Sequence, residues 1–329
     1  MLPAEASSYW SDQQRLTAST LALVRRLWRR MQQGDLDETW FRIAGPMLIA
    51  VLQAQEEAAR AAVDYVPAVL GATNIDAVPE GAVQTSALVG VAGDGRPVDS
   101  LLVGARVAAK NAVAAGQSRA QAVDAGGRWL NTAVSTLLSD TGRAAESVGI
   151  AARPGVGYVR MLNPPSCSRC VVLAGKYYRW NRGFRRHPGC DCRHIPARES
   201  MSDDLRVEPR RYFESLPQAA QESTFGVAGS QAIRDGADLG QVVNANRGTQ
   251  TAQVFGRQLD ITLEGVTRRG RAYRAMSEAG YVQRQGELRA TGERYRSWRA
   301  PRLMPETIYR IADDRADALR MLRLYGYLD

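Results

Sequence analysis

All four cysteines and both histidines of this 329-residue chain lie in one short window, in the order Cys167-x2-Cys170-x16-His187-x2-Cys190-x-Cys192-x-His194. Thiolate sulfur and imidazole nitrogen are the ligands that select Zn2+, which binds four of them in a tetrahedron. The alternatives are two disulfides or free thiols. A metal site is favoured because the rest of the chain lacks cysteine, and its 45% hydrophobic residues can form a core without covalent staples.

The window offers more ligands than one Zn2+ can bind. The predicted set, in order of preference, is Cys167, Cys170, Cys192, His187 and Cys190. His194 comes last. Which four of the six residues hold the metal stays open at this point.

The pattern favours a structural metal over a catalytic one. A catalytic zinc keeps a position for water and normally has a carboxylate base close by, but the window contains no Glu, and Asp191 lies between two cysteines. The motifs of zinc deaminases and zinc proteases are both missing. A zinc-dependent nuclease that uses His187 or His194 with Asn181 remains an alternative.

Positive charge gathers around the same window. Residues 1–150 carry 13 basic and 15 acidic side chains, whereas residues 151–329 carry 30 and 19, and residues 151–198 alone have ten basic side chains and one acid. The predicted patch comprises Arg169, Lys176, Arg179, Arg182, Arg185, Arg186 and Arg193. It would attract nucleic acid or an acidic protein surface, or it would offset the charge of metal-bound thiolates.

The first 150 residues read as a helical domain. Apolar side chains recur at helical spacing over 11–31, and Asp37 begins a second helix towards Tyr65 that Pro46 bends or interrupts. A loop over 71–97 precedes helices over 98–115 and 118–138, the latter capped by Ser118.

The predicted secondary structure changes at residue 151. Strands are predicted over 155–161 and 176–180, which makes 151–198 a small α+β module with a short β-hairpin. Residues 199–329 read as a helical C-terminal region, with helix starts at Pro209 and Pro305 and a cap at Asp313 or Asp314. Few aliphatic residues and many Arg and Gly predict an extended arm over 246–300. The fold class is therefore mainly α, in several segments, with a zinc-stabilised module.

Neither a membrane span nor a secretory signal is expected. The first residues have no basic n-region, and the longest apolar run, 43–52, is broken by Gly45-Pro46 and too short to cross a bilayer. The expected compartment of synthesis is a reducing cytosol.

The window also resembles a known family. Pro165 to Lys176, followed by His187 to Pro196, is similar to the MuF-like minor head (minor capsid) proteins of tailed bacteriophages, in which Cys-x-x-Cys, Leu-x-Gly-Lys and His-Pro-x-Cys-x-Cys recur in this order. The stretches 225–238, 241–245 and 303–312 look like the C-terminal part of such proteins from actinobacterial phages. The excess of Arg over Lys fits a GC-rich background.

The resemblance implies a virion protein that associates with the portal protein and with capsid or scaffold proteins in the host cytoplasm during head morphogenesis. It also implies packaging with phage DNA and a role in genome packaging or delivery. No catalytic residue, small-molecule substrate or membrane partner is predicted. The cofactor expected is structural Zn2+. A zinc-dependent nuclease or a DNA-binding accessory factor is the alternative.

Overall fold

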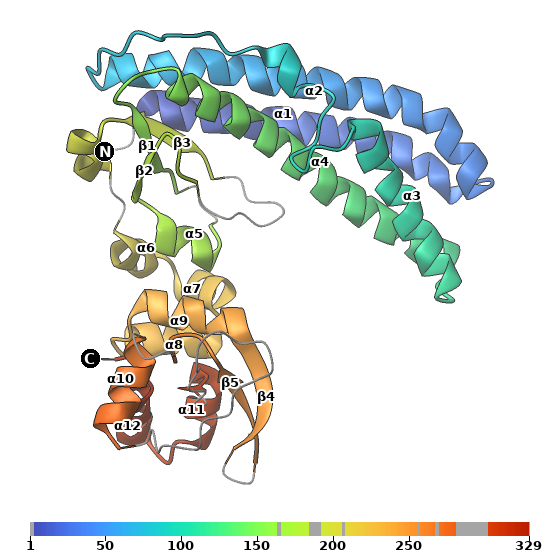
Figure 1. Cartoon of the computed structure of the whole chain (residues 1–329). Coiled ribbons are helices and arrows are strands. Elements are labelled where there is room, and N and C mark those ends of the chain that lie inside the picture. Colours follow the sequence, from blue (N-terminus) through green and yellow to red (C-terminus); the bar gives the residue numbers. More distant parts are fainter. Residues whose placement is uncertain are drawn as a thin grey trace, which may run out of the picture. The chain divides into compact units, whose positions relative to one another are not determined.

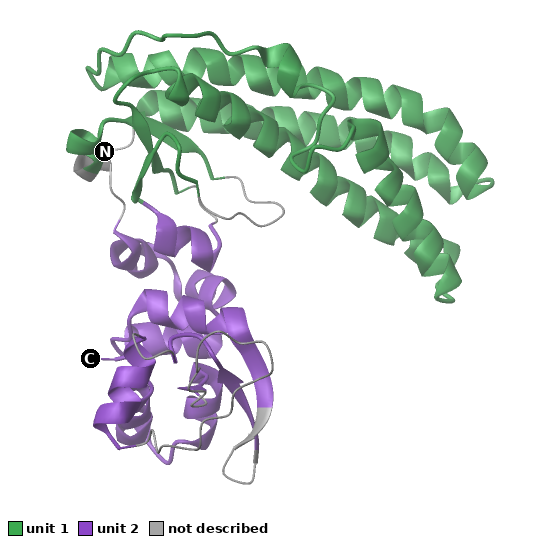
Figure 2. Ribbon diagram, in the orientation of Figure 1, with its two compact units in different colours: residues 1–163, 175–206 green, residues 164–174, 207–329 purple. Residues whose placement is uncertain are grey.

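The computed structural model describes residues 3–162, 166–183, 192–205, 208–254, 257–266, 270–280 and 302–328. The chain divides into two compact units, each built from two stretches of sequence (Figure 2). Unit 1 comprises Met1–Asn163 and Gly175–Arg206, and unit 2 comprises Pro164–Ala174 and Val207–Asp329. The protein is mainly helical, as predicted, with two small antiparallel sheets.

Long helices form most of unit 1 (Figure 1). They are α1 (Ala4–Trp28), α2 (Leu36–Ala72), α3 (Val98–Ala114) and α4 (Arg119–Ala151), with short 3-10 turns η1 (Arg29–Gln32) and η2 (Thr85–Leu88). The predicted helix starts are confirmed at Ser118, which forms a capping box with Gln121, and near Asp37, where Asp35 caps α2.

Helix α1 begins earlier than predicted, at Ala4, and α2 and α4 end later than predicted. Pro46 does not interrupt α2, because Ile43, Met47 and Val51 on either side of it are fully buried and their packing outweighs the lost backbone hydrogen bond. Helix α4 continues beyond Leu138 to Ala151. Its last turns bury a mixed set of small and polar side chains that carries no clear apolar periodicity.

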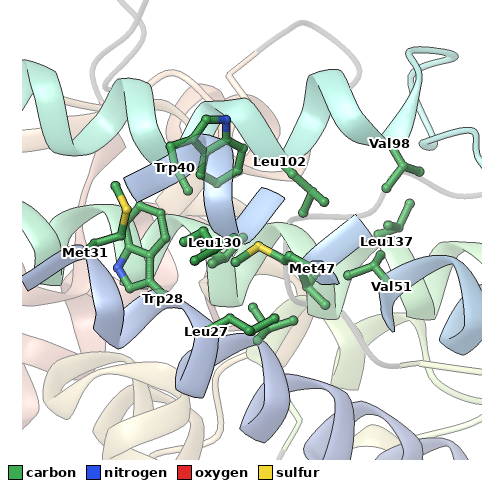
Figure 3. Close-up of a cluster of buried hydrophobic side chains, with 14 of the residues drawn as sticks. Leu27, Trp28, Met31, Trp40, Met47, Val51, Val98, Leu102, Leu130 and Leu137 are labelled. Carbon is green, nitrogen blue, oxygen red and sulfur yellow. The ribbon is translucent and has the colours of Figure 1, made fainter. Parts of the chain in front are cut away.

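The first core of unit 1 lies between these helices (Figure 3). The rings of Trp28 and Trp40 meet edge to face, with centroids 6.3 Å apart. The indole N–H of Trp28 donates to the Val123 carbonyl of α4 over 2.9 Å. Gly126 makes this approach possible, since a Cβ there would lie 2.5 Å from Trp28.

A three-stranded antiparallel sheet completes unit 1. Its strands are β1 (Gly157–Arg160), β2 (Tyr177–Arg179) and β3 (His194–Ala197), with β1 in the centre. The hairpin predicted over 155–161 and 176–180 is confirmed. Strand β3 was not predicted, because it is only four residues long and contains Pro196.

This sheet packs on the helical bundle. A second buried cluster joins Val156, Tyr158 and Ile195 to Tyr65 of α2 and Ile150 of α4. The strands predicted as part of a separate module over 151–198 therefore share a core with residues 1–150, and the boundary expected at 150/151 is not a boundary of the fold. The first two cysteines lie in the other unit.

Unit 2 is built from short elements. They are α5 (Ser168–Leu173), α6 (Pro209–Ser215), α7 (Gln218–Phe225), α8 (Val227–Arg234), α9 (Leu239–Ala245), η4 (Asn246–Gly248), β4 (Thr249–Val254), β5 (Arg257–Thr262), α10 (Arg271–Glu278), β6 (Arg302–Leu303), α11 (Pro305–Ile311) and α12 (Arg315–Leu324). The helix starts predicted at Pro209 and Pro305 and the cap at Asp314 are confirmed. Unit 1 also contains η3 (Glu199–Leu205).

The extended arm predicted over 246–300 is wrong for the described part of that range. Strands β4 and β5 pair along their whole length, and β6 extends the sheet on the other side of β5. Few aliphatic residues suffice here, because Leu259 and Ile261 alternate along β5 and are both buried. Residues 281–301 lie outside the described residues.

A buried arginine holds the C-terminal turn of unit 2. The Arg302 guanidinium donates to the carbonyls of Glu264, Tyr325 and Gly326 and stacks over the Tyr327 ring, with 3.8 Å to its centroid. Burial lowers the pKa of Arg302. The three carbonyl groups and the face of the Tyr327 ring compensate the positive charge of Arg302.

Across the described ranges, no helix combines the length and apolar character needed to cross a lipid bilayer.

Replacing Gly126 with Ala should destabilise unit 1. The added Cβ would lie 2.5 Å from Trp28 and 2.6 Å from the Ala105 carbonyl oxygen. Overpacking of this kind costs about 1–3 kcal/mol, which exceeds the gain of about 0.5–1 kcal/mol from Ala in a helix. Denaturant unfolding should show a lower free energy of unfolding for Gly126→Ala. Gly71→Ala is the control, because a Cβ there has nothing within 4 Å. Equal effects of the two substitutions would contradict the packing described.

Candidate metal centre

The first two predicted ligands form a close thiol pair in unit 2. Cys167 caps α5, and its Sγ accepts the Cys170 backbone N–H over 3.4 Å. The two sulfur atoms are 3.1 Å apart, with Cys170 buried and Cys167 partly exposed. A two-residue spacing across the first turn of a helix places both side chains on the same side, which is the arrangement of a metal-binding knuckle.

A third predicted ligand, Cys192, lies in unit 1 shortly before β3. It is buried, and its Sγ accepts a hydrogen bond from the Arg160 guanidinium over 3.3 Å. Arg160 stands opposite His194 in the register of β1 and β3. A guanidinium at a sulfur atom stabilises the thiolate form, which is the form that binds metal.

The remaining two predicted ligands, His187 and Cys190, lie outside the described residues. Within the parts of the chain that are described, no group of three or more Cys, His, Asp or Glu side chains could hold a metal. The donors that are described fit Zn2+ by type. They are thiols, in a close pair on α5 and beside a compensating cation at Cys192.

The residues that follow Cys192 enter a buried polar cluster in unit 1, which we call the Glu146 cluster. It comprises Tyr9 and Gln13 of α1, Tyr65 of α2, Glu146 of α4, and Arg193 and His194. One carboxylate oxygen of Glu146 accepts from the Tyr9 hydroxyl over 2.9 Å and lies 3.4 Å from Arg193 Nη1. The other accepts the His194 backbone N–H over 3.2 Å.

Two aromatic rings close the Glu146 cluster. The Tyr65 hydroxyl donates to the His194 carbonyl over 2.7 Å, and the Tyr65 ring stacks on Tyr9 at 4.1 Å between centroids. The Arg193 guanidinium lies near the Tyr9 ring, 5.5 Å from its centroid. Gly142 leaves space for this guanidinium, since a Cβ there would lie 2.7 Å from Arg193 Nη1.

Burial dominates the electrostatics of this cluster. It raises the pKa of Glu146 above its ordinary value, although Arg193 and the hydrogen bonds from His194 and Tyr9 act in the opposite direction. Burial, reinforced by the Glu146 carboxylate, also raises the pKa of Tyr9 well above the usual value. Tyr9 therefore remains a hydroxyl donor at neutral pH.

A second arginine, Arg143, forms a hydrogen bond with the backbone of Cys192. Arg143 of α4 donates to the Cys192 carbonyl over 3.2 Å and pairs with Asp140 at 2.6 Å. Consecutive residues from Cys192 to His194 are thus each bonded to α4. The segment that carries a predicted metal ligand is held by buried polar contacts to the helical bundle.

The predicted basic patch is only partly a surface feature. Arg169, Lys176, Arg179 and Arg182 are exposed, with Arg179 lying 3.8 Å from Glu199. Arg169 belongs to unit 2 and the other three to unit 1. Arg185 and Arg186 lie outside the described residues.

Arg193 does not belong to this patch. Only 1% of its surface is exposed, because the residues around β3 are covered on both faces and the Glu146 carboxylate compensates its charge. Sequence reasoning placed it on the surface by charge alone. Among the described residues, the exposed part of the predicted patch is therefore Arg169, Lys176, Arg179 and Arg182.

The geometry does not favour catalysis by His194. Ser147 Oγ and Glu146 Oε2 lie 3.5 Å and 3.4 Å from the same ring nitrogen, Nδ1, whereas a hydrolase triad needs its carboxylate and hydroxyl on opposite nitrogens. The imidazole is also buried, so a phosphodiester cannot reach it, although Asn181 is exposed. The nuclease alternative then rests on His187, outside the described residues.

Sequence reasoning missed the residues that hold the site, above all Glu146, Tyr9 and Tyr65. A signal was present: Glu146 follows Leu138 and Gly142 at four-residue spacing, so it lies on the face of α4 that Leu138 buries. An isolated carboxylate on such a face needs a buried partner.

Comparisons of the chain with protein-family models, with curated proteins and with solved structures gave no match.

Replacing Glu146 with Ala should strongly destabilise unit 1 and loosen β3. Removing one partner of a buried ion pair costs about 3–5 kcal/mol, since Arg193 would be left buried without its carboxylate. We expect a lower free energy of unfolding and faster amide hydrogen exchange in His194–Ala197. Glu146→Gln, which keeps the size and an acceptor for Tyr9, should lose less.

The matched control is Glu57→Ala, because Glu57 is exposed on α2. Its free energy of unfolding should change little. Unchanged exchange rates in β3 of the Glu146→Ala protein would show that the cluster does not hold the strand.

Proposed function

We propose that this protein is a minor head protein of the MuF-like type, which acts by association and not by catalysis. The observation that carries the proposal is the ordered motif of Cys167, Cys170, Leu173-x-Gly175-Lys176, and His187-Pro188-x-Cys190-x-Cys192. A motif of several spaced elements is far more specific than a single cysteine pair. The proposed setting is the capsid interior or portal vertex of the virion, reached from the host cytoplasm.

The described parts of the motif have structural roles, which supports the non-enzymatic assignment. Gly175 adopts a positive φ of 69°, where glycine is favoured, and its N–H donates to the Arg160 carbonyl. The Lys176 carbonyl accepts from the Arg160 N–H over 3.3 Å. The Gly175-Lys176 step thus aligns β2 with β1.

We further propose that Zn2+ is held by four of Cys167, Cys170, His187, Cys190 and Cys192. When bound, such an ion supplies a structural cross-link, because the binding free energy of a structural zinc is folding free energy. These residues lie at both ends of the 167–192 segment. The metal would fix the conformation of that segment without taking part in a reaction.

The contact with the portal or capsid is assigned to the helical bundle. Phe41 and Ile49 of α2 are 74% and 59% exposed, and Val107 and Val113 of α3 are also exposed. Large exposed apolar side chains on neighbouring helices are typical of protein-binding surfaces. The small net charge of residues 1–150 favours a contact that depends on apolar burial.

A DNA-binding accessory factor is the second candidate. It is favoured by Trp180, which is 57% exposed in the turn after β2, next to exposed Arg179 and Arg182. An aromatic ring between cations can stack on an unpaired base while the cations contact phosphates. This function would add to the association with the head and does not exclude it.

Purified protein should contain one Zn2+ per chain. Elemental analysis would measure the stoichiometry, and titration with a chelator should release the metal together with reactive thiols and lower the melting temperature. Cys167→Ser/Cys170→Ser should lose the metal. Less than one Zn2+ per chain, with thiols that react without chelator, would contradict a structural zinc site.

The protein should bind the portal protein of the same phage through α2. Phe41→Ala/Ile49→Ala is expected to weaken retention in a pull-down by about tenfold or more, as removal of central apolar anchors does. Retention should change little with salt. Val78→Ala/Val227→Ala, at apolar positions exposed elsewhere, is the control. Equal retention of all these proteins, or binding that vanishes at moderate salt, would argue against the assigned surface.

A further inference from the structure

A second cationic surface lies on unit 1, at the end of α1. Arg25 and Arg26 occupy its last turn, and Arg29 and Arg30 follow in η1. All four are exposed, as is Arg128 of α4. We call these five residues the α1 arginine patch.

Arg128 belongs to the same surface because hydrogen bonds join α1 and α4 at this position. The Arg25 side chain donates to Asn131 Oδ1 over 3.0 Å, and Trp28 donates to the Val123 carbonyl. Arg128 lies one helical turn before Asn131, on the same side of α4. Nearby Arg119 donates to the carbonyls of Met31 and Gln32 and adds a sixth positive charge.

The charges of this patch are not compensated within the bundle. Over residues 3–162, no carboxylate lies within ion-pair distance of its five guanidinium groups. The neighbouring acids at the start of α2 are engaged elsewhere: Asp35 caps the helix, Asp37 pairs with Arg106 and Lys110, and Glu38 lies 3.7 Å from Arg42. Asp124, one turn before Arg128, is exposed and offsets one charge at most.

Helix stability alone does not account for the patch. A cation near a helix C-terminus is favoured by the helix dipole, which acts only within the last turn. Arg25 with Arg29, and Arg26 with Arg30, are spaced four residues apart, where like charges repel each other along a helical path. The patch stands out further because residues 1–150 as a whole carry more acidic than basic side chains.

The side chains exposed on this surface favour one class of partner over the others. No large apolar side chain is exposed over described residues 3–40; those of unit 1 begin at Phe41. A protein interface has an apolar centre, and single-stranded nucleic acid needs aromatic rings for stacking, so a purely cationic surface suits neither well. A cluster of exposed arginines suits a duplex, which carries about one negative charge per 1.7 Å of its axis.

We propose that the α1 arginine patch binds the phosphate backbone of double-stranded DNA, without reading its sequence. This site is separate from the cationic residues around Trp180 and uses neither the cysteines nor a metal. It would give the helical unit an interaction with DNA in addition to the proposed association with the head.

The test uses the full-length protein and a short labelled DNA duplex, with binding followed by fluorescence anisotropy between about 50 and 200 mM salt. The patch variant is R26Q/R29Q/R30Q, which leaves the Arg25–Asn131 bond intact. The control is R15Q/R60Q/R96Q, which removes the same charge from exposed arginines that pair with Asp12, Glu56 and Asp94.

The patch variant should bind DNA about tenfold or more weakly. The slope of log affinity against log salt should become less steep by about 0.9 for each phosphate that the variant no longer neutralises. The control should stay within about twofold of the unsubstituted protein. If the triple variant does not fold, as judged by circular dichroism, the single variants R29E and R30E serve instead and should each weaken binding.

Three results would overturn the proposal. Equally weakened binding in patch variant and control would show that only net charge matters. Weaker binding confined to a K176Q/R179Q/R182Q variant would assign DNA binding to the turn around Trp180. Unchanged DNA binding with weaker retention of portal protein by the patch variant would assign the patch to an acidic protein partner.

Discussion

The buried pairing of Glu146 with Arg193 and His194 is the interaction on which unit 1 depends most. The Glu146 carboxylate accepts hydrogen bonds from the Tyr9 hydroxyl of α1 and from the backbone N–H of His194 at the start of β3. A fully buried carboxylate is strongly disfavoured unless it is compensated, so these contacts must form together with the core around them. The sheet β2-β1-β3 is thereby fixed to the bundle by a polar contact of defined geometry, in addition to the apolar contacts of Tyr158 and Ile195.

This anchoring gives the cysteine motif a physical interpretation. Cys192 immediately precedes the anchored residues, its carbonyl is bonded to Arg143, and its sulfur faces Arg160. In unit 2, Cys167 and Cys170 are brought together by a single turn of α5. Two kinds of constraint therefore act on the segment 167–192. At Cys167 and Cys170 it is the local geometry of α5, and at Cys192 it is the buried ion pair that the next residue, Arg193, forms with Glu146. The proposed zinc would add a third.

Each difference between expectation and structure has its own physical reason. Strand β5 was missed because its apolar pattern consists of only two buried aliphatic residues, Leu259 and Ile261, while pairing with β4 and β6 supplies its backbone hydrogen bonds. Strand β3 was missed because it is short and contains a proline. Arg193 was placed on the surface because charged side chains usually lie there, and only its partner Glu146, distant in sequence, makes its burial possible.

Features that depend on interactions between neighbouring residues could be predicted from the sequence. Helix caps at Ser118 and Asp314 and the close pair of Cys167 and Cys170 depend on residues near one another in the chain. Tertiary structure alone decided which unit each described cysteine joins, that the sheet belongs to the helical bundle, and that Arg193 is internal. These outcomes depend on contacts between α1, α4 and β3, and the energy of a buried charge is set by partners that chain order does not reveal.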